Sequence, residues 1–317
     1  MIMHTHQPVL LDTCLEYLEA ETGGWYLDAT FGTGGHTRAL LDSSSHTRVV
    51  ALDQDPDAET HARELHALYG ERFTFYRQNF STLQTQLNTQ LDGRLDGILF
   101  DLGVSSCQLD KAERGFSFRF DASLDMRMNP DEGAPASHFL NHASTEQLIR
   151  AIRDYGEERR WKRVVHAVHE ARGGEALQRT TAFAELVARA VGPAGKHAPI
   201  HPATRTFQGV RIAVNKELEA LELALPTAFS LLRSGGKLLV ISFHSLEDRI
   251  VKRFFRRMAG KPEHGRDSRS QMEREALANI LTPRPIQPDE QEIAQNRRSR
   301  SARLRVLCKQ TNGESDA

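Results

Sequence analysis

The sequence predicts an α/β fold in which helices cover both faces of a largely parallel sheet. Three observations predict it. Short strand-like runs alternate with helical stretches up to residue 101. Residues 108–207 then show helical periodicity and no strand-like run, and the alternation resumes after them. Strand–helix alternation builds parallel sheets covered by helices, so the helical block is predicted to be an insertion in such a domain.

The first elements follow from apolar spacing. The chain opens with an amphipathic helix, because Leu10, Leu11, Cys14, Leu15 and Leu18 repeat at helical intervals. Four strands and three helices are then expected in alternation. The strands are predicted at 25–28, 48–53, 73–76 and 96–101, and the helices at 36–42, 56–69 and from residue 81.

The second half is predicted in the same way. Ser144-Thr-Glu-Gln147 has the pattern of a capping box, and apolar stripes predict helices around 148–155, 161–168 and 183–190. Beyond the insertion we expect a helix at 210–223, a strand at 237–243 after Gly235-Gly236, a helix capped by Ser245–Asp248, and a half-buried edge strand at 301–308.

These elements give the expected domain organisation. Residues 1–107 and 208–317 are predicted to form one discontinuous domain, and 108–207 an inserted helical domain that recognises substrate. Residues 260–296 are rich in Pro, Gly, Gln and charge and are predicted to be a loosely ordered connector.

Composition narrows the class of protein. The 317 residues are 39% hydrophobic with a net charge of −1, which is typical of a globular domain. No apolar run approaches the roughly 20 residues that span a bilayer, so no membrane partner is predicted. The three cysteines form no C-x-x-C pair, so neither a disulfide framework nor a metal site is expected, and free thiols are typical of the cytoplasm.

Two local clusters of basic residues stand out against the neutral net charge. They span 249–257 and 297–305. Such clusters can bind a phosphate backbone, but a solvated helix face and a polar tail explain them equally well.

A glycine loop, Asp28-Ala-Thr-Phe-Gly-Thr-Gly-Gly-His36, follows the first predicted strand. Such a turn lets a ligand approach the backbone, and Asp53 at the end of the second strand could bind ribose hydroxyls. The loop alone is ambiguous. Thr37 stands where a dinucleotide fingerprint needs its third glycine, so S-adenosylmethionine fits better than a dinucleotide. We therefore predict that Gly34→Val or Gly35→Val crowds out the cofactor and spares the fold.

Other residues could carry chemistry near this loop. Asp101 ends the fourth strand, where such sheets bind the reacting group. Phe80 could stack on an adenine, although core packing is equally plausible. Arg114–Phe120 interleaves arginines and aromatics, as RNA contacts do, and is also compatible with a half-buried loop. His244 follows the fifth strand and could line a cavity, although a structural histidine is the simpler interpretation.

Several longer motifs resemble a known family. They are 103–110 (GVSSCQLD), 113–118 (ERGFSF), 124–128 (LDMRM), 155–158 (YGEE), 201–208 (HPATRTFQ) and 242–249 (SFHSLEDR). Together they are similar to the MraW/RsmH family of bacterial 16S ribosomal RNA cytosine-N4 methyltransferases, from about residue 6 to 306.

The resemblance implies a fold, a cofactor and a substrate. The fold is a Rossmann-like class I methyltransferase sheet with an inserted all-helical domain. The substrate is a decoding-centre cytidine of 16S ribosomal RNA in the small ribosomal subunit, and a homodimer is allowed. The implied contacts to S-adenosylmethionine are Gly34, Gly35, His36, Asp53, Phe80, Asp101 and Gln108.

The predicted reaction depends on positioning. The cytosine amine is a weak nucleophile, so catalysis can rest on in-line placement and on a hydrogen bond that localises its lone pair. We predict that Asp101 orients the amine. Other amino-methyltransferases often have Asp/Asn-Pro-Pro-Tyr at this strand end, whereas this chain has Asp-Leu-Gly-Val, so no proton acceptor is assigned. The target pocket is predicted to be lined by Ser105, Ser106, Arg114, Asp125 and His244.

Three alternatives stay open from the residues alone. Cys107 could add to the pyrimidine ring and direct methylation to carbon 5. The glycine loop could belong to a nicotinamide-dependent oxidoreductase. The protein could also be a non-catalytic RNA-binding factor with a vestigial cofactor fold.

Overall fold

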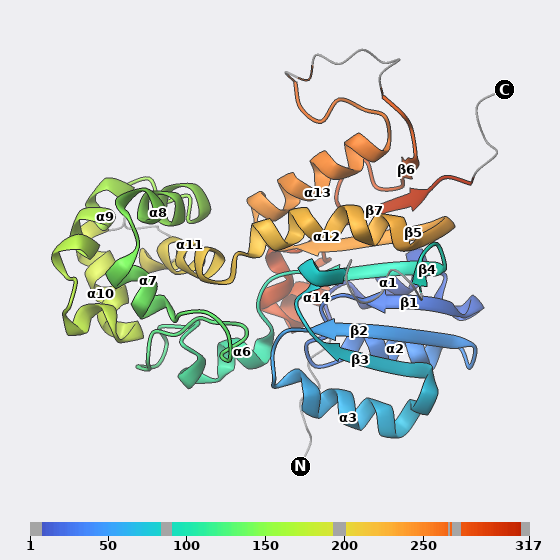
Figure 1. Ribbon diagram of the computed structural model, residues 1–317, viewed down its shortest axis with the longest axis horizontal. Helices are drawn as coiled ribbons and strands as arrows, with labels where there is room; N and C mark the ends of the chain where they lie inside the picture. Colours follow the sequence, from blue (N-terminus) through green and yellow to red (C-terminus); the bar gives the residue numbers. More distant parts are fainter. Residues whose placement is uncertain (1–7, 84–90, 193–200, 266, 268–273, 312–317) are drawn as a thin grey trace. The chain divides into compact units, whose positions relative to one another are not determined.

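The computed structural model describes residues 8–83, 91–192, 201–265, 267 and 274–311 (Figure 1). The chain divides into two compact units. The sheet unit contains residues 1–103 and 218–317, and the helical unit contains residues 104–217. The sequence-based boundaries at 107 and 208 both fall inside the helical unit.

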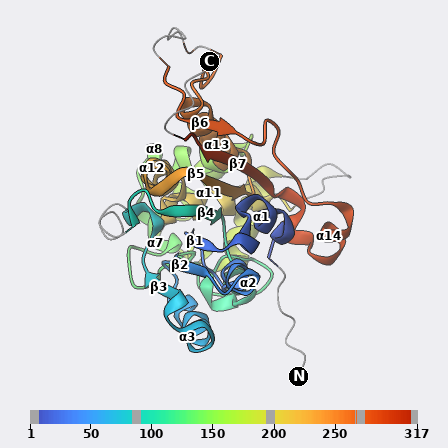
Figure 2. The same ribbon diagram turned by 90° about the vertical axis from the view of Figure 1, so that its right-hand side faces the viewer.

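A seven-stranded sheet forms the centre of the sheet unit, with the order β3-β2-β1-β4-β5-β7-β6. The strands follow one another in the reverse of this order from top to bottom in Figure 2. The first five strands in the order are parallel, and β7 runs antiparallel to β5 and β6. The bounds are β1 Gly24–Asp28, β2 Thr47–Asp53, β3 Phe73–Arg77, β4 Leu95–Asp101, β5 Leu232–Ser242, β6 Ala278–Ile280 and β7 Arg303–Lys309.

Helices cover both faces of this sheet, as the alternation predicts. One apolar cluster joins the strands to α12 and α13, and a second joins the opposite face to α1, α2 and α3 (Figure 1). Because β1 pairs with both β2 and β4, the strand order reverses beside β1, where open sheets of this type bind ligands. The helices are α1 Leu11–Leu18, α2 Gly35–Ser43, α3 Ala58–Tyr69, α12 Glu217–Leu231, α13 Ser245–Met258 and α14 Glu290–Gln295.

Two expectations for the C-terminal part are wrong. The predicted edge strand, β7, is an inner strand, because the three-residue strand β6 pairs with its outer side. Arg305 of β7 is also buried, and its guanidinium donates to the Asp248 carboxylate of α13. The predicted connector at 260–296 contains both β6 and α14. Elements this short carry too few residues for apolar periodicity to reveal them.

The helical unit packs around its own apolar cluster, which includes Leu148, Val164, Phe183 and Phe207. The predicted capping box is confirmed, with Ser144 as the N-cap. The helix expected at 210–223 is instead two helices, because Lys216 adopts a left-handed conformation (φ 51°). The elements are α6 Ser106–Asp110, α7 Ala136–His142, α8 Thr145–Ile149, a π-helical turn Arg150–Tyr155, α9 Trp161–Glu170, α10 Thr180–Val191 and α11 Ala203–Asn215.

No helix in the described part of the chain combines the length and the apolar character that a membrane crossing requires.

Candidate active site at the carboxyl edge of the sheet

Three aspartates end three neighbouring parallel strands. Asp28 ends β1, Asp53 ends β2 and Asp101 ends β4. Since β1 lies between β2 and β4, the three carboxyl groups gather at one edge of the sheet, which we call the carboxyl edge. The sequence predicted all three acids at the ends of their strands.

Asp28 is held from two sides. The Thr37 hydroxyl donates to Asp28 Oδ2 (2.7 Å), and the Thr30 N–H donates to Oδ1 (3.2 Å). Burial nevertheless raises the Asp28 pKa to about 6, and the two hydrogen bonds only partly offset that rise. Thr37, noted in the sequence only as a missing glycine, thus fixes the acid at the head of the loop.

Asp53 closes the glycine loop. Its Oδ2 accepts the Gly32 N–H (2.7 Å), and its Oδ1 accepts the Asp55 N–H (2.9 Å). Gly32 has φ +55°, and a Cβ placed on it would meet no atom within 4 Å. Burial raises the Asp53 pKa to about 6. Each carboxyl oxygen keeps a second lone pair for a ligand, so the expected contact to ribose hydroxyls stays a prediction.

Asp101 differs from the other two because one oxygen is not bonded. The residue is half-buried, but its Oδ1 is sealed from solvent and has no hydrogen-bond partner within the described residues. Its backbone N–H donates to Thr30 Oγ1 (2.6 Å), which ties the ends of β4 and β1 together. Burial, followed by the negative charges of Asp28 and Glu247, raises the Asp101 pKa to about 8.

This arrangement fits a cationic ligand. A buried polar atom without a partner costs about 1–3 kcal/mol, and a charged group costs more. The charges that act most strongly on Asp101 are both negative. A ligand that brings positive charge to this edge would favour the ionised carboxyl groups and offset that cost.

The glycine loop constrains the protein more than we predicted. A Cβ on Gly34 (φ +79°) would come within 2.7 Å of the Phe31 ring, and one on Gly35 would collide with the Pro8 ring. Valine at either position would require the Phe31 or Pro8 ring to shift, so local packing in the sheet unit would change. That the rest of the fold stays largely intact is still a prediction. His36 is buried with Nε2 3.1 Å from the Val9 carbonyl oxygen, and burial lowers its pKa to about 4, so it is neutral.

Phe80 lies just after β3, in a short 3₁₀ turn. Its ring packs edge-to-face on Phe100 at 5.5 Å, and it is only partly buried. Asn79 Nδ2 donates to Gln54 Oε1 (2.7 Å), which holds this turn beside the end of β2. The Phe80 ring therefore contacts the core, and part of its surface is still accessible to a ligand.

His244 caps α13, one residue earlier than predicted. Its Nδ1 accepts the Glu247 N–H (3.4 Å), while Glu247 Oε2 accepts the N–H groups of Phe243 (2.8 Å) and His244 (3.3 Å). His244 Nε2 lies 3.1 Å from Glu247 Oε1. Ser245 is the commoner N-cap residue type, so the sequence favoured the wrong residue.

The remaining predicted residues belong to the helical unit. Ser105 and Gln108 form the capping box of α6, in which Ser105 Oγ accepts the Gln108 N–H (3.2 Å) and Gln108 Oε1 accepts the Ser105 N–H (2.9 Å). Ser106 is the first residue of that helix. These polar groups thus have local structural roles.

Arg114 and Asp125 are likewise bonded within the helical unit. The Arg114 guanidinium donates to the carbonyl oxygens of Arg127 (3.2 Å) and Met128 (2.9 Å). Asp125 receives a two-pronged pair from Arg127, with Nε at 2.8 Å and a terminal nitrogen at 2.7 Å. Both residues therefore hold the 114–128 segment together.

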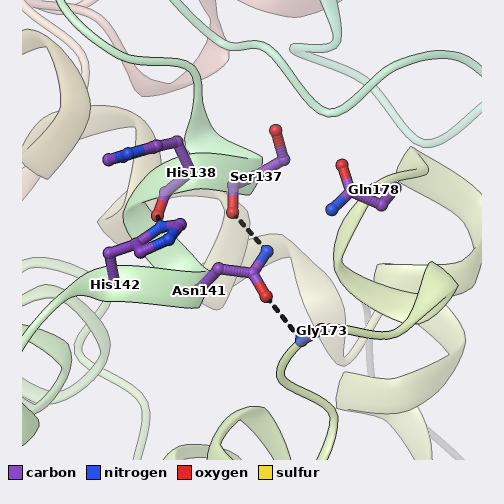
Figure 3. Close-up of a pocket in the computed structure, with 6 residues that line it drawn as sticks. All are labelled: Ser137, His138, Asn141, His142, Gly173 and Gln178. Atoms are coloured by element: carbon purple, nitrogen blue, oxygen red, sulfur yellow. Dashed lines mark hydrogen bonds between the residues drawn. The ribbon is translucent and has the colours of Figure 1, made fainter.

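A pocket of about 430 Å³ opens on the helical unit (Figure 3). Asn141 donates to the Ser137 carbonyl oxygen and accepts from the Gly173 N–H (2.8 Å), and the His138 and His142 rings stack 4.1 Å apart. None of the residues predicted to be functional lines it. The lining residues are Ser137, His138, Asn141, His142, Gly173 and Gln178.

Sequence reasoning passed over the supporting residues of the carboxyl edge. Thr30 and Thr37 hold Asp28, Thr30 also accepts the Asp101 N–H, and the charge of Glu247 raises the Asp101 pKa. The threonines occupy loop and helix positions that fit no motif. Glu247 could have been found, since an acid three residues after His244 completes a capping box.

The sequence of the chain matches a family of known proteins. Residues 3–310 match the MraW methylase family. A Thermomicrobium roseum protein named ribosomal RNA small subunit methyltransferase H is 46% identical over 310 residues, covering 95% of this chain and 93% of that protein. A Heliobacterium modesticaldum protein of the same name is 45% identical and covers 98% and 99%.

Solved structures are more distant. An rRNA methylase from Streptococcus thermophilus is 12% identical with a TM-score of 0.41, and the two chains are covered to 94% and 95%. A Streptococcus mutans protein solved in complex with SAH is 11% identical with a TM-score of 0.43, covering 96% and 99%. TM-scores this low bear neither on the site nor on the substrate. The match over residues 3–310, together with the close full-length relatives, shows that this chain belongs to the MraW methylase family.

Proposed function

We propose that this protein transfers a methyl group from S-adenosylmethionine to the exocyclic N4 amine of a decoding-centre cytidine in 16S ribosomal RNA. It acts in the cytoplasm, and its substrate is the RNA within the small ribosomal subunit. The observation that carries the proposal is the buried, unpartnered Oδ1 of Asp101 at the reversal of strand order. Membership of the methylase family and relatives named for the small-subunit RNA support it.

The carboxyl edge suits this donor. Bound there, S-adenosylmethionine supplies a methyl group on a positively charged sulfonium, which makes that methyl strongly electrophilic. Gly32 leaves open space beside the backbone, and Asp28, Asp53 and Asp101 provide the negative charge that a cationic ligand needs. Phe80 offers a partly exposed ring for stacking.

Asp101 acts on the acceptor. An ionised Asp101 accepts a hydrogen bond from the cytosine amine, which draws the nitrogen lone pair out of the ring and aims it at the methyl group. The target base must leave its stack, at a cost of a few kcal/mol, and contacts elsewhere on the protein must offset that cost. We assign this recognition in part to the helical unit.

The test uses purified protein, S-adenosylmethionine and small subunits from cells that lack the protein. The RNA is digested to nucleosides and separated by chromatography with mass spectrometry. We expect N4-methylcytidine at one position. Carbon-5 methylcytidine would contradict the proposal and favour a Cys107 thiolate mechanism, which Cys107→Ala would then abolish. Cofactor binding without any methyl transfer would favour a non-catalytic role.

A further inference from the structure

Helix α13 has a basic side over residues 249–257. Arg249, Lys252, Arg253, Arg256 and Arg257 stand at i, i+3, i+4, i+7 and i+8. At about 100° per residue they fall within an arc of about 140°, on a single face. The other side holds Val251, Phe254 and Phe255, which are buried in the core of the sheet unit. The buried side fixes the helix, so the basic side is presented rigidly.

Three of these cations form no ion pair within the described part of the chain. Arg249, Lys252 and Arg253 are exposed, and none pairs with an acidic side chain among the described residues. We call these three residues the basic face.

The nearby groups of opposite charge are already engaged. Asp248 is paired with Arg305 (2.7 Å) and Arg303 (3.6 Å), and Glu247 is buried against backbone N–H groups. At the C-terminal end, Arg256 donates to the Pro262 carbonyl oxygen, and Arg257 lies 3.9 Å from Glu263. Within the described chain, therefore, only the basic side chains at the C-terminal end of α13 have partners on the protein.

The helix dipole does not account for the basic face. Cations stabilise a helix only in its last turn, where Arg256 and Arg257 stand. Arg249, Lys252 and Arg253 lie before that turn. Three uncompensated cations on one turn and a half repel one another, so their arrangement points to an anionic partner.

We propose that the basic face of α13 binds the sugar–phosphate backbone of the substrate ribosomal RNA. This inference rests on the function proposed above. The capping residue of α13, His244, follows β5 by two residues, so the helix starts at the carboxyl edge of the sheet. RNA held along α13 would therefore be held beside the end of the sheet where Asp101 lies. A membrane surface fits less well, since the apolar side of α13 is in the core and cannot insert.

The test compares a triple variant with a matched control. Arg249→Ala/Lys252→Ala/Arg253→Ala removes the basic face, and Arg48→Ala/Arg63→Ala/Arg94→Ala removes three exposed cations elsewhere in the sheet unit. KM for small subunits, the salt dependence of RNA binding, and the Kd for S-adenosylmethionine are measured for both. Arg249→Lys/Arg253→Lys tests whether charge alone suffices.

We expect the first variant to raise KM roughly 100-fold at 0.1 M salt and to lower the slope of log K against log salt by about 2, as for three lost phosphate contacts. The Kd for S-adenosylmethionine should stay unchanged, the lysine variant should keep most of the affinity, and the control should resemble wild type.

Two results would overturn the inference. The first is that wild type methylates RNA and the triple variant has the same KM and the same salt slope as wild type. This result would leave the proposed function intact. The other is loss of binding to anionic phospholipid vesicles with RNA binding intact. If wild type methylates no ribosomal RNA, the proposed function fails instead, and RNA binding by the two variants still decides whether the basic face binds RNA.

Discussion

The carboxyl edge of the sheet unit and the 105–128 segment of the helical unit both contain residues predicted to be functional, yet their polar groups are treated differently. At the carboxyl edge, burial raises the pKa of three aspartates, and one oxygen of Asp101 has no partner. In the helical segment, Ser105 and Gln108 cap a helix, and Asp125 is paired with Arg127.

This difference shows that a sequence motif can have either of two physical roles. Polar groups that satisfy one another stabilise a local structure, while buried charge without compensation is costly and persists where a ligand supplies the compensation. The carboxyl edge is therefore the better candidate for ligand binding and catalysis. The polar groups of the helical segment are better explained as stabilising the fold of the helical unit.

The largest expected effect is at Asp101. Asp101→Asn removes the charge that orients the amine, so the single-turnover methylation rate should fall roughly 100-fold. Because the folded-state pKa (about 8) lies above the usual value of 3.8, ionisation favours the unfolded chain, and Asp101 lowers stability increasingly from about pH 4 to pH 8. The variant should therefore be more heat-stable than wild type at about pH 8 and similar to it near pH 4.

Asp92→Asn is the matched control, since Asp92 is exposed and lies before the amino end of β4. It should leave both the rate and the melting temperature unchanged. A fully active Asp101→Asn protein would show that Asp101 has no part in the mechanism. The two regions would then no longer differ in function in the way described above.

A smaller effect is expected at the ion pair of the helical unit. The side chains of Arg127 and Asp125 are 20% and 24% exposed, so solvent screens the pair only partly. Asp125→Asn should lower the free energy of unfolding by about 1–2 kcal/mol, measured by urea denaturation. Cofactor affinity should not change. Unchanged stability together with a raised KM for RNA would instead place Asp125 in the substrate pocket.

The smallest effect is expected at the capping box of α6. Gln108→Ala loses one reciprocal hydrogen bond, which is worth about 1 kcal/mol, and thermal denaturation should show a correspondingly small shift. Calorimetry with S-adenosylmethionine decides between the two interpretations of this residue. A loss of cofactor affinity beyond about tenfold with little change in stability would show that Gln108 binds the cofactor, as the family resemblance implies.

The sequence was sufficient for the α/β class and for the strand ends Asp28, Asp53 and Asp101, because a buried apolar strand followed by an acid is a local pattern. It could not reveal that Thr37 holds Asp28, since that contact depends on how the loop closes. The burial of Arg305 was equally hidden, because its partner Asp248 lies 57 residues away. Short β6, which turns β7 into an inner strand, carries only three residues of signal.

The most direct test of the carboxyl edge is calorimetry of S-adenosylmethionine binding in two buffers with different ionisation enthalpies. A cationic ligand should drive Asp101 to ionise, so the binding of S-adenosylmethionine to wild type should release close to one proton at about pH 7. As the pH is raised toward 8, the affinity for S-adenosylmethionine should increase by up to about tenfold per pH unit. Asp101→Asn should release far less, because Asp28 and Asp53, with pKa values of about 6, are largely ionised already. Binding that is independent of pH and releases no proton would contradict the account.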